Sequence, residues 1–260
     1  MKTRILRFVL PLLSKTNLLI KYGILPFGLG KVYIETSSVC NRRCKFCPNY
    51  KYPREPALME EWIFKKIIDE LAEINFHGVL APHLFNEPLL DSRLENFVKY
   101  ARKKLPEVRI KIFTNGDFLT IKKFRKLLKA GVDEFSVTQY DEEMSDVMKN
   151  LFSSITIKER KKIKYRLLTE ENHLLNIGGT VSVKKSIYKI VCNTHFLMIN
   201  HKGDVVLCGC DYFGSVVFGN AKKENVLSIW NKPHYKKIRD ELAKGIFNLE
   251  ICKKCVGLIK

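Results

Sequence analysis

Three thiol groups fall within one short segment of this chain, CNRRCKFC, at Cys40, Cys44 and Cys47. A structural zinc site takes four protein ligands, and the next downstream candidate, His77, lies beyond a predicted helix. Three thiolates can instead hold three irons of a cubane [4Fe–4S] cluster and leave its fourth iron without a protein ligand. The segment therefore predicts a cluster whose open iron binds a further molecule.

Five more cysteines lie in the last third of the chain, including Cys210. Clustered thiols in a chain without an evident signal peptide hold a metal more often than they form disulfides. We therefore expect a cytoplasmic protein with a second metal site. Cys192 and Cys208 flank a predicted hairpin, and Cys252 and Cys255 follow a predicted helix. Four such thiolates can close a second [4Fe–4S] cluster with no open iron, and a zinc site is the alternative.

Strand-like and helix-like segments alternate along the first half of the chain. The helix that ends near residue 105 is expected to begin at Asp91, a favourable N-cap residue. The alternation predicts an α/β fold with a parallel sheet, whose functional residues follow the carboxyl ends of the strands. The expected strands are 31–37, 78–85, 109–113, 134–139 and 164–168, and the expected helices are 60–75, 91–105 and 120–130.

The sequence changes in character near Cys192. Residues 196–208, FLMINHKGDVVLC, alternate around a Lys-Gly-Asp turn and predict a β-hairpin, and residues 226–244 predict one helix. We therefore expect three parts, namely an N-terminal extension at 1–30, a core domain at 31–188 and a cysteine-bearing module at 189–260.

The chain is strongly basic, with 46 Lys and Arg against 27 Asp and Glu and a net charge of +19. This excess favours an acidic or phosphorylated small-molecule substrate, although solvated faces of lysine-rich helices explain it as well. No nucleic-acid-binding motif is present, so no nucleic-acid partner is expected. The apolar run Phe8–Leu13 is far shorter than the roughly 20 residues of a membrane span. The basic amphipathic segment 1–30 either contacts a membrane surface peripherally or packs on the domain.

The Cys-x3-Cys-x2-Cys spacing, with Phe46 directly before the last cysteine, resembles the signature of the radical S-adenosylmethionine (SAM) superfamily. Membership implies a partial (β/α)6 TIM-like barrel and a [4Fe–4S] cluster on Cys40, Cys44 and Cys47. It also implies that SAM binds the open iron through its amino and carboxylate groups, with Phe46 near the adenine.

The C-terminal cysteines resemble twitch, a shortened SPASM module found in this family. A full SPASM module uses more cysteines than the five available here, so the resemblance implies one auxiliary [4Fe–4S] cluster. Cys208 is preferred to Cys210 because it stands five residues after Gly203, as in that module. The implied ligands of the auxiliary cluster are Cys192, Cys208, Cys252 and Cys255.

Three further segments resemble the family members that dehydrogenate an aminocyclitol alcohol, namely FNEPLL at 85–90, FTNGDFLT at 113–120 and SVTQY at 136–140. By that resemblance, the loop containing the first of these segments meets the amino group of SAM, and the ends of the later strands help to hold SAM. The residues implied in these two roles are Asn86, Glu87 and Pro88 in the loop, and Thr114, Asn115 and Gln139 on the later strands.

One position departs from those dehydrogenases. They carry an arginine that touches the substrate hydroxyl, and the matching stretch here is Asn176-Ile177-Gly178-Gly179. Ile177 can neither donate a hydrogen bond nor move a proton, so we expect a different small-molecule substrate. His83, on the second strand with the parity of Phe85, is then the candidate catalytic residue.

The resemblance implies that an electron donor such as ferredoxin or flavodoxin reduces the first cluster, and that SAM is then cleaved to a 5′-deoxyadenosyl radical. This radical abstracts hydrogen from the substrate. We expect a two-electron oxidation of an alcohol on a sugar, cyclitol or similar small molecule, with the auxiliary cluster as electron acceptor. Two alternatives stay open, namely modification of a peptide or protein by the same chemistry, and a non-catalytic iron–sulfur or zinc protein.

Overall fold

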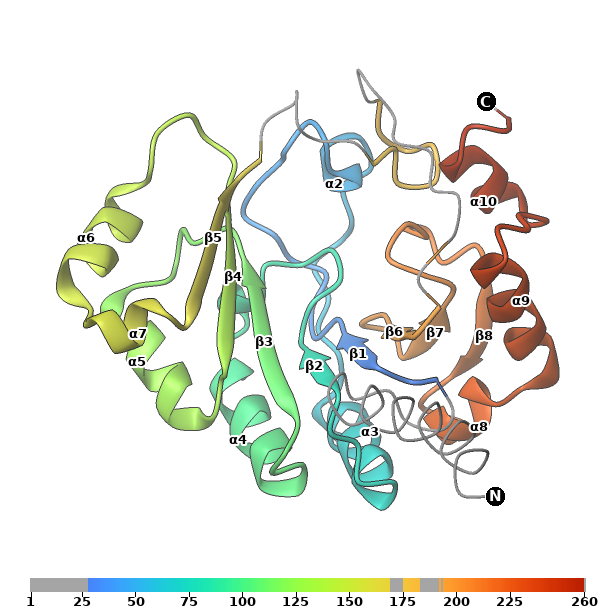
Figure 1. Cartoon of the computed structure of the whole chain (residues 1–260), viewed down its shortest axis with the longest axis horizontal. Helices are drawn as coiled ribbons and strands as arrows, with labels where there is room; N and C mark the ends of the chain where they lie inside the picture. The colour runs from blue at the N-terminus through green and yellow to red at the C-terminus, as the bar shows by residue number, and fades with distance from the viewer. Residues whose placement is uncertain (1–27, 169–174, 183–191, 193, 260) are drawn as a thin grey trace, which may run out of the picture.

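The computed structural model describes residues 28–168, 175–182, 192 and 194–259. Within these residues the strands form one eight-stranded sheet in the order β5-β4-β3-β2-β1-β6-β7-β8. Figure 1 shows this sheet as an arc with the helices along its outside. The two edge strands of the arc, β5 and β8, are not neighbours in the sheet. The barrel is therefore only partial, as the family resemblance implied.

The first five strands run parallel to one another, as the alternation of strands and helices predicted. They are β1 (Lys31–Ile34), β2 (Val79–Ala81), β3 (Arg109–Thr114), β4 (Glu134–Gln139) and β5 (Ile163–Leu167). The helices between and beside them are α2 (Pro48–Lys51), α3 (Glu61–Glu73), the 3₁₀ helix η1 (Pro88–Leu90), α4 (Leu94–Lys104), α5 (Ile121–Ala130), α6 (Asp146–Ser154) and α7 (Ile157–Arg160).

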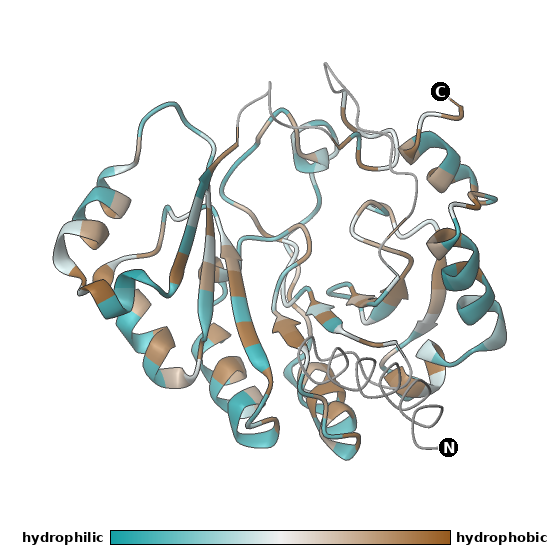
Figure 2. Cartoon of the chain, in the orientation of Figure 1, coloured by the Kyte–Doolittle hydropathy of each residue, from teal (hydrophilic) through white to brown (hydrophobic). Residues whose placement is uncertain are grey.

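Helix α5 shows how local sequence determines these elements. The Thr120 side chain accepts a hydrogen bond from the Lys123 backbone N–H and caps the helix, and Gly131 ends it with φ at +119°. Only glycine adopts such a backbone conformation without strain. The helix buries Phe124 and Leu127, and Figure 2 shows both hydrophobic and hydrophilic segments along the helices of this half. The apolar faces pack on the sheet and form the core.

A sixth parallel strand comes from the C-terminal module and lies beside β1. β6 (Phe196–Ile199) pairs with β1 along its whole length. β7 (Asp204–Val206) and β8 (Val217–Asn220) continue the sheet in antiparallel pairing, which confirms the predicted hairpin. The core and the module therefore share one continuous sheet.

Three details of the sequence-based prediction are wrong. The helix expected at 226–244 is two helices, α8 (Val226–Trp230) and α9 (Pro233–Ala243), because Pro233 begins a new helix and holds Lys232 in an extended conformation. Asp91 is not the N-cap of α4. Its carboxylate binds the backbone N–H and guanidinium of Arg93 instead, and α4 begins at Leu94. The second strand is also shorter than expected, at Val79–Ala81.

The N-terminal extension lies almost entirely outside the described residues, so its contact with a membrane or with the domain stays a prediction. Its described end, residues 28–30, leads into β1, and Leu29 is buried there. None of the helices in the described part of the chain is long and apolar enough to cross a membrane.

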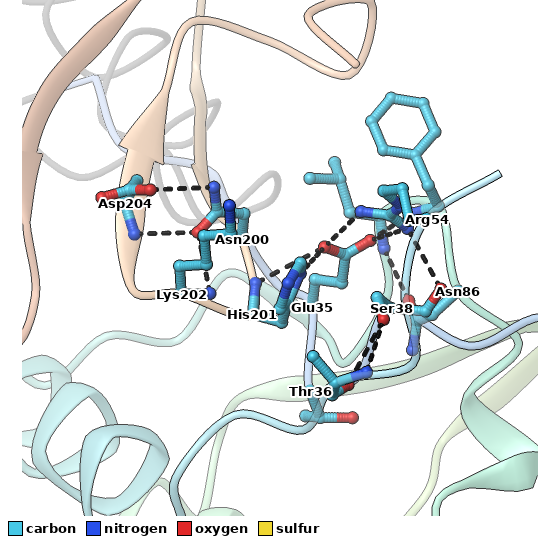
Figure 3. A network of polar contacts seen from close by, with 12 residues as sticks. Glu35, Thr36, Ser38, Arg54, Asn86, Asn200, His201, Lys202 and Asp204 are labelled. Atoms are coloured by element: carbon cyan, nitrogen blue, oxygen red, sulfur yellow. Dashed lines mark hydrogen bonds and ion pairs between the residues drawn. The ribbon is translucent and has the colours of Figure 1, made fainter. Parts of the chain in front are cut away.

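A buried carboxylate at the end of β1 joins four segments of the chain (Figure 3). Glu35 is fully buried and accepts two hydrogen bonds from the Arg54 guanidinium, at 2.8 and 3.0 Å. It also contacts Nδ1 of His201 at 2.9 Å and accepts a bond from the Phe85 backbone N–H at 3.1 Å. Burial alone raises the pKa of Glu35, but the bonds from His201 and Arg54 outweigh it and lower the pKa to about 2. The carboxylate therefore ties the segment after the first cysteines and the β6–β7 turn to β1.

Replacing Glu35 by Gln should lower the free energy of unfolding by about 3 kcal/mol, because breaking a buried ion pair leaves Arg54 without its counter-charge. The folded pKa of about 2 lies below the ordinary value of 4.5. The stabilisation from Glu35 is therefore complete above pH 4.5 and is lost as the pH falls toward 2. Urea unfolding at pH 7, followed by circular dichroism, measures the difference.

The matched control is Glu60→Gln, because Glu60 forms an ion pair with Lys222 on the surface. Exposed pairs contribute little to stability, so this variant should unfold like the parent protein. Equal losses of stability in the two variants would contradict the role given to Glu35.

Candidate active site and auxiliary metal centre

The cysteines of the first motif line a cavity of about 330 Å³, here called the core cavity. Cys40, Cys44 and Cys47 lie in the segment that follows β1, and the other walls come from residues at or after the carboxyl ends of β2, β3, β4 and β5. Parallel α/β folds place their sites at this edge of the sheet. Most of the site residues predicted from separate segments therefore meet in one place.

The first cysteine segment is held by a clamp that the sequence analysis missed. The Arg42 guanidinium pairs with Asp117 at 2.6 Å and with Asp141 at 2.7 Å, at the ends of β3 and β4. Asn41 also donates to Asp117 at 2.6 Å, and its side-chain oxygen accepts from Asn115 at 2.8 Å. Arg42 lies inside the motif and Asp117 inside FTNGDFLT, so a signal was present in segments already singled out.

The three thiols are partly buried, which changes how readily they lose their protons. Burial raises the pKa of Cys40, Cys44 and Cys47, and that of Cys44 reaches about 12. A metal ligand must be a thiolate, so metal binding at these residues has to displace protons.

Glu87 brings three of the predicted SAM-binding residues together. It is buried and accepts hydrogen bonds from Thr114 Oγ1 at 2.7 Å, the Asn115 backbone N–H at 2.8 Å and the Leu89 backbone N–H at 3.1 Å. Burial raises the pKa of Glu87 to about 7 despite these donors. The carboxylate therefore joins the loop after β2 to the end of β3.

The neighbours of Glu87 in the same loop differ in position. Asn86 lines the core cavity, and its side-chain nitrogen is buried without a hydrogen-bond partner among the described residues. Pro88 begins η1 and does not line the cavity. Of Asn86 and Pro88, it is therefore Asn86, with its unpaired side-chain nitrogen, that faces the space where SAM is expected.

An aromatic pair and an arginine also line the core cavity. The Phe46 ring stacks on Tyr140 at a centroid distance of 5.4 Å. Gln139 does not line the cavity, because its side chain donates to the backbone oxygens of Asp141 and Glu142. Thr138 and Arg166 line it instead, joined by a 3.0 Å bond from Arg166 Nε to Thr138 Oγ1. The sequence predicted the strand that contains Arg166, but not that the Arg166 side chain lines the cavity.

His83 and Ile177 both line the core cavity. The His83 ring stacks on Phe113 at 5.3 Å, and its Nδ1 atom is buried with no hydrogen-bond partner in the described part of the chain. Burial lowers the pKa of His83 to about 4, so the ring is neutral at pH 7. Ile177 adopts a positive φ of 46°, a strained conformation for a β-branched residue.

All five C-terminal cysteines line a second cavity of about 230 Å³, here called the auxiliary cavity. Cys252 and Cys255 project from α10 (Glu250–Cys255), and Cys192 precedes β6. Cys208 and Cys210 follow β7, and the Cys210 backbone N–H donates to Cys208 Sγ at 3.3 Å. Burial raises the pKa of Cys252 to about 12. The predicted ligands therefore surround one space, and Cys210 stands beside them.

The two cavities share part of their walls. Leu175 and Gly209 line both of them. The turn that holds Ile177 is attached to α10 by a 2.9 Å bond from the Asn176 side chain to the Lys254 backbone oxygen. The two cavities are therefore adjacent, with Leu175 and Gly209 in the wall between them.

The residues present fit the clusters that the motifs predict. The cysteines line the two cavities, and each cavity has buried polar atoms without hydrogen-bond partners among the described residues. These are His83 Nδ1 and Asn86 Nδ2 in the core cavity, and Tyr235 Oη and Arg239 Nη1 in the auxiliary cavity.

Comparison with known proteins agrees with this arrangement. The model of the radical SAM superfamily matches residues 34–163, and the model of SPASM, an iron–sulfur cluster-binding domain, matches residues 192–256. The S-adenosyl-L-methionine-dependent 2-deoxy-scyllo-inosamine dehydrogenase of Niallia circulans is 28% identical over 230 residues, which are 86% of this chain and 91% of the relative.

Two further relatives extend the comparison. The tungsten-containing aldehyde ferredoxin oxidoreductase cofactor-modifying protein of Pyrococcus furiosus is 30% identical over 188 residues, 68% of this chain and 50% of that protein. The crystal structure of BtrN in complex with AdoMet and 2-DOIA superposes with a TM-score of 0.80 and 27% identity, covering 87% of this chain and 92% of that one. With a cysteine-lined cavity at the carboxyl edge of a partial barrel and a SPASM domain beside it, this chain belongs to the radical SAM superfamily.

Proposed function

We propose that this enzyme oxidises an alcohol of a sugar, cyclitol or similar small molecule to a carbonyl, with an auxiliary cluster in the second cavity as electron acceptor. The observation that carries the proposal is the wall of Leu175 and Gly209 that the two cavities share. An electron that leaves a substrate in the core cavity has only this layer to cross. The similarity to a cyclitol dehydrogenase over most of the chain supports the reaction class.

When bound, the first cluster and SAM supply a 5′-deoxyadenosyl radical that abstracts one hydrogen atom from the substrate. Oxidation of the alcohol carbon then requires the loss of one more electron and one proton. The chain must therefore hold SAM, exclude water and accept the proton. It must also keep the electron acceptor close to the substrate. Cys40, Cys44 and Cys47 would hold the first cluster, and Cys192, Cys208, Cys252 and Cys255 would hold the auxiliary cluster.

The SAM-binding roles fall on residues that surround the first cysteines. Phe46, stacked on Tyr140, offers a flat apolar surface for the adenine. Asn86 offers its buried side-chain nitrogen, and Glu87 fixes Thr114 and Asn115 beside it. Pro88 and Gln139 contribute to SAM binding indirectly. Pro88 begins η1, and the Gln139 side chain holds the turn after β4.

We assign His83 as the residue that accepts the proton. Its Nδ1 atom is buried at the core cavity without a partner, and the ring is neutral at pH 7 because burial lowers its pKa to about 4. A neutral imidazole can accept the proton of the substrate hydroxyl after the neighbouring carbon has lost its hydrogen atom, and such help is typically worth about 100-fold or more in rate.

The walls of the core cavity indicate what the substrate carries. Ile177 presents an apolar side chain where the similar dehydrogenases carry an arginine, so this wall makes no hydrogen bond to a substrate hydroxyl. Arg166 supplies positive charge on another wall. An acidic or phosphorylated substrate would complement Arg166 and the net charge of +19.

Iron content and product analysis test the two-cluster arrangement. Anaerobically reconstituted protein should bind about eight irons, and the variant with Cys40, Cys44 and Cys47 all changed to Ala should keep about four. Cys44→Ala should abolish deoxyadenosine formation from SAM. Cys255→Ala should still form deoxyadenosine but release no carbonyl product, because the second electron has no acceptor.

Stoichiometric zinc without iron in the second site would overturn the auxiliary cluster. Equal loss of deoxyadenosine in the Cys44 and Cys255 variants would show that the second site is structural and takes no electron. Formation of a modified peptide in place of a small carbonyl compound would favour the peptide-modifying alternative.

Changing His83 to Phe should preserve the stack on Phe113 and remove the proton acceptor. Carbonyl formation should fall by about 100-fold or more, whereas deoxyadenosine should still form. Since His83 is already neutral above about pH 4, its titration should not shape the rate between pH 6 and 9. The control is His77→Phe, which lies near the start of β2, at the opposite end of that strand from His83. Full carbonyl yield from the His83 variant would exclude this role.

The apolar side chain of Ile177 should make 2-deoxy-scyllo-inosamine a poor substrate. A buried hydroxyl without its partner costs about 1–3 kcal/mol, which is about 5- to 150-fold in affinity. Phosphorylated or carboxylated cyclitols and sugars should be oxidised faster, and Arg166→Gln should slow only these. The measurement is carbonyl formation across a substrate panel, and efficient turnover of the aminocyclitol would contradict the prediction.

A further inference from the structure

Two polar side chains on one face of α9 reach the auxiliary cavity. Tyr235 and Arg239 are one helical turn apart, and both line the cavity with the five cysteines. The Tyr235 ring stacks on Phe218 at 3.6 Å with an interplanar angle of 7°. The Arg239 guanidinium lies 3.6 Å from the centroid of the Trp230 ring and 4.3 Å from that of Tyr235. Their packing therefore fixes where the polar ends of both side chains lie.

The two polar ends lie near each other, and the Tyr235 hydroxyl and the Arg239 guanidinium interact. Tyr235 Oη and Arg239 Nη1 are buried atoms without a hydrogen-bond partner among the described residues. No ion pair to Arg239 is found within these ranges either. The half-buried Arg239 guanidinium brings positive charge to this wall, and a buried hydroxyl that donates to nothing is unfavourable. The wall therefore offers a cation and a hydroxyl donor to something negative inside the cavity.

The proposed occupant of the cavity meets this requirement. A [4Fe–4S] cluster on four thiolates has a net negative charge, which increases when the cluster takes up an electron. Its sulfur atoms accept hydrogen bonds, and such bonds are one of the determinants of the reduction potential. Positive charge and donors near the cluster stabilise the reduced form more than the oxidised form.

We propose that Tyr235 and Arg239 donate hydrogen bonds to sulfur atoms of the auxiliary cluster and raise its reduction potential. The inference rests on the proposed function, because it assumes that a cluster occupies this cavity. The electron balance is one-electron reduction of the auxiliary cluster by the substrate after its hydrogen atom has left. A higher potential makes this transfer more favourable, so the two side chains would equip the cluster as an acceptor.

The potential can be measured without catalysis. The full-length variant with Cys40, Cys44 and Cys47 changed to Ala retains only the auxiliary site, and a redox titration followed by electron paramagnetic resonance gives its midpoint potential. Adding Arg239→Met should make reduction about tenfold less favourable, which is 59 mV for one electron. Tyr235→Phe, which removes a single oxygen, should shift the potential in the same direction by less. Arg239→Lys, which keeps the charge, should lose only part of the effect.

The matched control is Arg160→Met. The Arg160 guanidinium also lies over an aromatic ring, 4.2 Å from the Phe152 centroid, but it lines neither cysteine cavity. This variant should leave the potential unchanged.

The possible outcomes distinguish a failure of this inference from a failure of the proposed function. Variants of Tyr235 and Arg239 that keep about four irons and the parent potential would overturn the inference alone. A parent variant that binds no iron in the second site would overturn the auxiliary cluster itself. If Arg239→Met prevents cluster loading, the midpoint of Tyr235→Phe decides the question, since its ring packing on Phe218 is retained.

Discussion

The Glu35 carboxylate lies at the point where the two halves of the molecule meet. It stands at the end of β1, which has β2 on one side and β6 on the other. Its partners come from the segment after the first cysteines and from the turn between β6 and β7. A buried carboxylate is tolerated only when such donors surround it. The same interaction therefore orders the cysteine segment and fixes the module against the core.

The relation between the two cavities follows from that junction. β7 runs antiparallel to β6 and so away from the carboxyl edge of β1, but the loop after it, which contains Cys208 and Cys210, returns to the segment of the first cysteines, where the Tyr212 hydroxyl donates to Asn49 Oδ1 at 2.7 Å. Gly209, between these two cysteines, then forms part of both walls. Arg42 and its two aspartates hold the other side of the core cavity against β3 and β4. The adjacency of the two cavities thus depends on the packing of the module on the core.

Buried polar atoms without partners mark both cavities. His83 Nδ1 and Asn86 Nδ2 lie at the core cavity, and Tyr235 Oη and Arg239 Nη1 lie at the auxiliary cavity. Proteins rarely leave such atoms unsatisfied, so each is a place where a bound group completes the structure. Burial of the thiols raises the pKa of Cys44 and Cys252 to about 12, so a metal that binds them must displace their protons.

Local patterns were sufficient for several features. The cysteine triplet spans one short segment, the Thr120 cap and Gly131 stop define α5, and the turn at Gly203 defines a hairpin. These depend on neighbours in the chain, so the sequence by itself determined them, together with the α/β class. The tertiary structure decided the rest, because side-chain direction depends on distant partners. It placed β6 beside β1, directed Gln139 away from the core cavity and Arg166 toward it, and held Arg93, the partner of Asp91, against the backbone oxygens of Thr36 and Met59. Above all, it made Leu175 and Gly209 a wall between two sites that are far apart in the chain, which only packing can bring about.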